Sequence, residues 1–202
     1  MNKANQEKLI NLVKSECKKH NIKFDLRKGK YINYQVGMKT SGFFDHQQKI
    51  LACAKKNPSF LYILAHEYCH LVQWQENCKV WTDYDNSQAE ILDEWLGGKN
   101  FDLKKIERAA RVALVLELDN EKRTIKLLKK FGMTKNEIDL YIQKSNAYVL
   151  FYLYILKTRK WYKPSNVPYE NMNVVSFMSK KFNMNYDKLS PKANKAFEMA
   201  NI

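Results

Sequence analysis

Two long helical segments follow one another in the second half of the 202-residue chain, and they limit its fold more than any other feature. The first is predicted over residues 101–130 and ends before Gly132. Thr134 and Glu137 form a capping-box pattern that begins the second, over residues 134–160. The first segment carries an apolar stripe at helical spacing, made of Leu103, Ile106, Ala110, Ala113, Leu114, Ile125 and Leu128.

Shorter elements are predicted in the first half of the chain. Residues 3–20 have the apolar spacing of an amphipathic helix. Residues 22–36 contain two runs rich in Ile, Phe, Tyr and Val around a turn at 27–30, which predicts a β-hairpin. The alternating residues 49–55 predict a third strand. The expected fold class is therefore α+β and mostly helical, with a small antiparallel sheet.

One domain is expected, because a chain of this length with 45% hydrophobic residues can bury one sizeable core. We place this domain over residues 1–162. Residues 163–202 contain three of the four prolines and many asparagines, so we expect an irregular C-terminal extension packed on the same domain. The N-terminus lacks the apolar region of a signal peptide, and no stretch is apolar enough to span a membrane. A cytoplasmic protein with reduced cysteines is expected.

The strongest motif is HEYCH at residues 66–70, an HExxH sequence within a predicted helix over residues 58–77. Residues four apart lie on one face of a helix, so His66 and His70 can both reach one metal ion. Glu67 lies beside them, where it can take a proton from metal-bound water. With four His and twelve Glu, the pattern arises by chance in about one such chain in two hundred. Two buried, hydrogen-bonded histidines are the alternative explanation.

A catalytic zinc needs a third protein ligand. A metzincin would supply it by continuing HExxHxxGxxH, but the two positions concerned are Gln73 and Glu76 here. The remaining histidines, His20 and His46, precede the motif and are weak candidates.

Two pairs of glutamates at helical i, i+4 spacing remain. Glu90 and Glu94 point away from the apolar residues of their segment, and Ser87 explains Glu90 as part of a capping box. Glu117 and Glu121 fall within the apolar stripe of the long helix. A carboxylate there is costly unless it is paired or bound to a metal. Glu117 is therefore the predicted third ligand, and a structural ion pair with Lys or Arg is the alternative.

HEYCH followed by a helix with Glu-x-x-x-acid resembles the gluzincin class of zinc metallopeptidases. The stretches HEYCHLVQWQE and ELDNEKRT also resemble small phage-encoded HExxH proteins of the minimal, SprT-like or ImmA/IrrE-like kind. The resemblance covers residues 58–125 and implies a zincin-like fold with HExxH on the active-site helix. It implies Glu117 as a zinc ligand and Glu121 as the acid that buttresses a zinc-binding histidine. The interval from His70 to Glu117 is long for the thermolysin pattern, whose spacing fits Glu90 better.

The resemblance implies an HExxH zinc metalloendopeptidase that hydrolyses protein or peptide substrates in the cytoplasm, which is the host's if the chain is phage-encoded. Zn²⁺ would be held by His66, His70 and Glu117, with Glu67 as the general base. In such peptidases an edge strand before the HExxH helix pairs with the substrate backbone, and residues 49–55 stand at that place in the sequence.

A donor to the developing oxyanion is also needed, and the sequence does not select one among the tyrosines of the second long helix. Those considered are Tyr141, Tyr148 and Tyr152.

The net charge of +14 points to an alternative function. A basic surface favours weak association with nucleic acid, although a Lys-rich solvated surface explains the same charge. The alternative is a basic nucleic-acid-associated protein with a structural or regulatory metal site. No CxxC pair or zinc-finger pattern supports it, and no membrane partner is expected. Steep salt dependence of binding to random DNA, without proteolysis, would favour this alternative.

Overall fold

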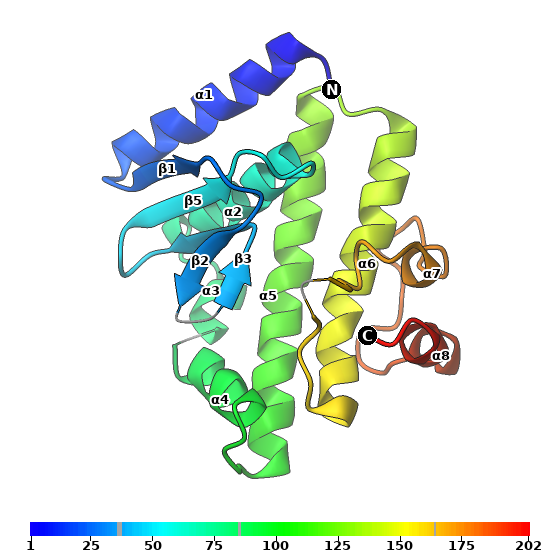
Figure 1. The fold of residues 1–202 in the computed structure, drawn as a ribbon. Coiled ribbons are helices and arrows are strands. Elements are labelled where there is room, and N and C mark those ends of the chain that lie inside the picture. Colours follow the sequence, from blue (N-terminus) through cyan, green and yellow to red (C-terminus); the bar gives the residue numbers. More distant parts are fainter. Residues whose placement is uncertain (36–37, 85, 164) are drawn as a thin grey trace. The chain divides into compact units, whose positions relative to one another are not determined.

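The computed structural model describes residues 1–35, 38–84, 86–163 and 165–202 (Figure 1). Helices dominate it and the strands are short, which confirms an α+β fold that is mostly helical. The chain divides into two compact units. Unit 1 consists of Met1–Cys78 and Arg123–Thr134, and unit 2 of Lys79–Lys122 and Lys135–Ile202. Among the described helices, none has both the length and the apolar character needed to cross a membrane.

Unit 1 contains a three-stranded mixed sheet in the order β1-β5-β4. β1 (Lys23–Arg27) lies parallel to β5 (Ile50–Ala54), and β4 (Gly42–Asp45) lies antiparallel to β5. A separate two-stranded antiparallel sheet pairs β2 (Ile32–Gln35) with β3 (Met38–Thr40).

Three expectations about the strands are wrong. The three-stranded sheet is mixed rather than antiparallel. The described part of the predicted hairpin, residues 22–35, does not form one, because β1 and β2 belong to different sheets. Residues 49–55 do not form an edge strand either, since β5 is the central strand and all five of its residues are buried. Side-chain periodicity predicts that a strand exists, but the partner of a strand depends on how distant segments pack.

Two helices of unit 1 pack near this sheet, α1 (Lys3–Lys19) against β1 and α2 (Phe60–Gln75) against β4 and β5. Asn57 fixes the backbone immediately before α2 by side-chain hydrogen bonds. Its Oδ1 accepts a hydrogen bond from the Ser59 backbone N–H at 2.8 Å, and its Nδ2 donates to Ser41 Oγ at 2.9 Å. α2 is thereby tied at its start to the loop between β3 and β4.

Gly42 on β4 allows a close approach between the sheet and α2. A Cβ atom at this position would lie 2.5 Å from Ile63 Cγ2 and 3.2 Å from Glu67 Cγ. A larger residue would therefore push against the helix turn that carries the HExxH motif.

Unit 2 is helical, and both predicted long helices are present as α5 (Leu103–Lys130) and α6 (Lys135–Thr158). α5 is continuous, and its residues from Arg123 onward belong to unit 1. Its predicted stripe is buried except for Leu103, which is 78% exposed because it is the first residue of the helix. The shorter helices are α3 (Lys79–Asp83), α4 (Asn86–Leu96), α7 (Met172–Val175) and α8 (Pro191–Met199).

Residues 163–202 are more regular than expected, because they contain α7 and α8. Ser190 caps α8 by accepting a hydrogen bond from the Ala193 N–H, and Pro191 occupies the first turn. Phe197 is fully buried and stacks on Tyr154 of α6, with ring centroids 4.9 Å apart. Packing of this apolar face stabilises a helix too short to be stable alone.

Candidate metal centre

The HExxH sequence lies in the middle of α2, as predicted. His66 and His70 are half-buried neighbours on successive turns, with ring centroids 4.8 Å apart and ring planes at 84°. The i, i+4 spacing therefore brings the two imidazoles to one side of the helix.

Gln73 orients one of these rings. Its side chain is fully buried, and its Oε1 lies 2.8 Å from Nδ1 of His70. An amide oxygen only accepts hydrogen bonds, so Nδ1 of His70 carries the proton in this tautomer. Nε2 then holds the lone pair that a metal ion requires. This role of Gln73 is not among the sequence predictions, and its i+3 spacing from His70 is the signal that indicates the contact.

Glu67 is only 8% exposed, and its Cγ faces the space above Gly42 of β4. The glycine leaves room for this side chain where any other residue would project a Cβ atom. Sheet and helix together therefore restrict where the Glu67 carboxylate can lie.

Glu117 and Glu121 are both buried on α5, at 9% and 4% exposure. Their side chains receive hydrogen bonds from hydroxyl groups of α6. Tyr148 Oη donates to Glu117 Oε1 at 3.2 Å, and Ser145 Oγ donates to Glu121 Oε2 at 2.7 Å. Both glutamates are buried, as their position in the apolar stripe predicts. Neutral hydroxyl groups help to stabilise both carboxylates.

The tyrosine hydroxyls around Glu117 remain protonated at ordinary pH. Burial raises the pKa of Tyr148 and of Tyr152 well above the usual value, and the nearby negative charge of Glu117 raises both further. Tyr148 Oη lies 3.3 Å from Tyr152 Oη. The two phenols therefore act as neutral hydrogen-bonding groups.

His66, His70 and Glu117 form the one group of three or more His, Cys, Asp or Glu side chains in the described chain that could hold a metal ion. One ligand atom from each lies within 4.8 Å of the other two. Ligand atoms around one tetrahedral zinc lie about 3.3 Å apart. Two imidazoles and one glutamate are a donor set of catalytic zinc sites. The residues fit the ion that the motif implies.

The other side chains weighed as ligands lie outside this group. Glu90 is exposed on α4, and Glu94 forms an exposed ion pair with Lys99 at 2.7 Å. His20 and His46 are not members of the group either. The side chain of Ser87, predicted to cap with Glu90, lies outside the described residues, and α4 begins at Asn86.

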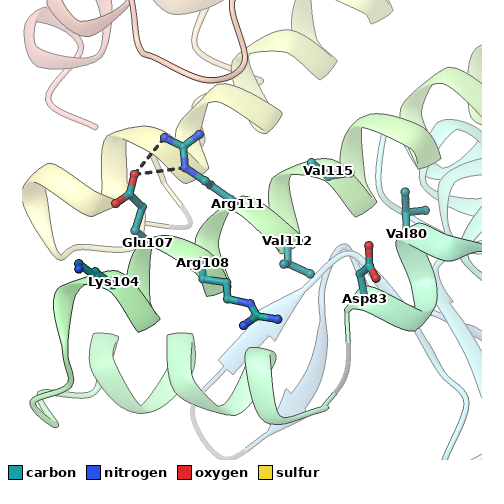
Figure 2. A pocket seen from close by; sticks show the side chains of 8 residues that line it. All are labelled: Val80, Asp83, Lys104, Glu107, Arg108, Arg111, Val112 and Val115. Carbon is teal, nitrogen blue, oxygen red and sulfur yellow. Dashed lines mark hydrogen bonds and ion pairs between the residues drawn. The ribbon is translucent and has the colours of Figure 1, made fainter.

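A pocket of about 360 Å³ in unit 2 lies beside α3 and α5 (Figure 2). Its carboxylates are engaged in ion pairs, Glu107 with Arg111 at 3.0 Å and Asp83 with Lys79 at 2.7 Å. It contains no histidine, so it lacks the donors of a zinc site. Its lining consists of Val80, Asp83, Lys104, Glu107, Arg108, Arg111, Val112 and Val115.

Comparison of the chain with protein families, with curated proteins and with solved structures found no match.

Proposed function

We propose that this protein is a zinc-dependent metalloendopeptidase that hydrolyses peptide bonds in protein or peptide substrates. The observation that carries the proposal is the grouping of His66, His70 and Glu117, with Glu67 next to the first histidine on α2. A chance HExxH sequence on a packed helix would not require a buried glutamate from a distant segment at the same place.

Each residue has a defined task in the proposed reaction. The two histidines and Glu117 would hold the ion, which would supply Lewis acidity for the scissile carbonyl and for water. Glu67 accepts the water proton as general base and delivers it to the leaving amine nitrogen as general acid. Its low exposure favours transfer, because a buried carboxylate has few competing water partners.

Removal of the metal tests this function directly. The zinc-loaded protein is expected to cleave a reduced, unfolded protein at internal bonds, producing new peptide ends that mass spectrometry detects. A chelator should abolish cleavage, and zinc added after its removal should restore it. If the zinc-loaded protein cleaves nothing yet binds random DNA with a steep salt dependence, the nucleic-acid-associated alternative is favoured.

The third ligand is tested by comparing Glu117→Ala with Glu90→Ala. Glu117→Ala should weaken zinc binding severely, because two histidines alone hold the ion poorly. Glu90→Ala should retain full zinc and change the free energy of unfolding by no more than about 0.5 kcal/mol, as expected for an exposed position. Competition with a chromogenic chelator measures both affinities. Loss of zinc from Glu90→Ala together with retention in Glu117→Ala would show that the shorter, thermolysin-like spacing is right.

A further inference from the structure

Three hydroxyl-bearing residues of α6 lie at spacings that bring them to one face of the helix. Ser145, Tyr148 and Tyr152 are separated by three and four residues. Ser145 and Tyr148 each donate to a buried glutamate of α5, and Tyr152 contacts the hydroxyl of Tyr148. α6 thus places hydroxyl groups against the carboxylates of its neighbour at two successive turns.

The ring of Tyr148 is held from two sides. It packs edge-on against Tyr152, with centroids 5.8 Å apart, and against Tyr169, with centroids 5.5 Å apart. A phenol with two rigid aromatic neighbours has little rotational freedom. The position of its hydroxyl, and hence of the carboxylate oxygen that accepts from it, is set by this aromatic packing.

We propose that Tyr148 is a positioning residue for the metal centre: its hydroxyl holds Oε1 of Glu117 and thereby presents Oε2 to the ion. The inference rests on the proposed metal site. It adds that Tyr148 orients Glu117, the third ligand of that site. A carboxylate on a flexible side chain loses rotational freedom when it binds a metal. A partner that orients it beforehand removes part of that loss. Tyr152 supports the arrangement through its contact with the Tyr148 hydroxyl.

Cobalt(II) provides a test that does not depend on hydrolysis. Its visible absorption reports the geometry of the ligands, and its affinity can be titrated in the full-length protein. Tyr148→Phe removes one oxygen atom and keeps the ring packing. We expect this variant to bind cobalt ~10–100-fold more weakly than the wild type, with an altered visible spectrum. Tyr152→Phe should show a smaller loss in the same direction.

Tyr154→Phe is the matched control. It also removes a phenol oxygen from a buried tyrosine of α6, but this residue stacks on Phe197 and has no described contact with either glutamate. Its cobalt affinity and spectrum should equal those of the wild type. A purely structural role for Tyr148 would lower thermal stability without changing the cobalt spectrum.

The possible outcomes separate the two proposals. If the wild type binds no cobalt and no zinc, the metal site fails and the role of Tyr148 fails with it. If the wild type binds cobalt and Tyr148→Phe matches it in affinity and spectrum, the metal site stands and the positioning role is overturned. If Tyr148→Phe does not fold, Tyr152→Phe decides, and wild-type affinity and spectrum in that variant would overturn the role.

Discussion

Glu67→Gln is expected to lower the rate of peptide hydrolysis by ~10²–10⁴-fold while zinc remains bound. The substitution keeps the size of the side chain beside Gly42 but removes its ability to accept a proton. His66, His70 and Glu117 are unchanged, so the zinc content of the purified variant should equal that of the wild type. Single-turnover cleavage of an unfolded protein, measured beside the zinc content, checks both parts.

Glu76→Gln is the control for this experiment. Glu76 follows the same helix and forms a partly exposed ion pair with Arg123 at 2.6 Å. Loss of such a pair changes stability by no more than about 1 kcal/mol and should leave hydrolysis unaffected. A Glu67→Gln variant that cleaves as fast as the wild type would exclude Glu67 as the base.

Replacing both His66 and His70 by Ala is expected to abolish zinc binding, because a single remaining carboxylate cannot retain the ion against water. Zinc at 100 times its dissociation constant should stabilise the wild-type fold by about 2.7 kcal/mol and raise its melting temperature. The double variant should show no such increase. Calorimetry with and without zinc, together with elemental analysis, measures the difference.

His46→Ala serves as the matched control, because His46 lies outside the metal-binding group and packs near Trp74, with ring centroids 6.4 Å apart. It should retain about one zinc per chain. Full stoichiometric zinc in the His66→Ala/His70→Ala variant would refute the site, whatever the behaviour of Glu117.

The long helices predicted from short-range pattern agree with the structure. The helical spacing around residues 101–130 and 134–160 corresponds to α5 and α6, and HEYCH lies within α2. The burial of Glu117 and Glu121 also follows from the apolar stripe on their own helix. A helix closes its hydrogen bonds within one segment, so neighbouring residues contain most of the information that specifies it.

Which strands pair with one another could not be predicted from the alternation of apolar and polar residues. The alternation in residues 49–55 is that of a half-buried strand, yet every residue of β5 is buried. Ile50, Ala52 and Ala54 cluster with Ile32 of β2, and α2 also contacts β5, while β1 and β4 pair with its two edges. β1 and β5 also pair in parallel, which requires a connection that the intervening residues, including β2 to β4, provide. No local signal distinguishes such a connection from a hairpin.

The placement of His66 and His70 on one side of α2, with Glu67 next to them, could be predicted from residue order alone, because the i, i+4 geometry of a helix is the same in every fold. The spacing of Gln73 from His70 permits their contact, but the rotamer that makes it does not follow from residue order. The contact between Tyr148 and Glu117 joins residues 31 positions apart, and no local pattern indicates it. It depends on how α6 packs against α5, and packing depends on the shapes of all the side chains between them. Local order therefore specifies which groups can react, whereas the folded chain specifies which hydroxyl and amide groups hold them in place.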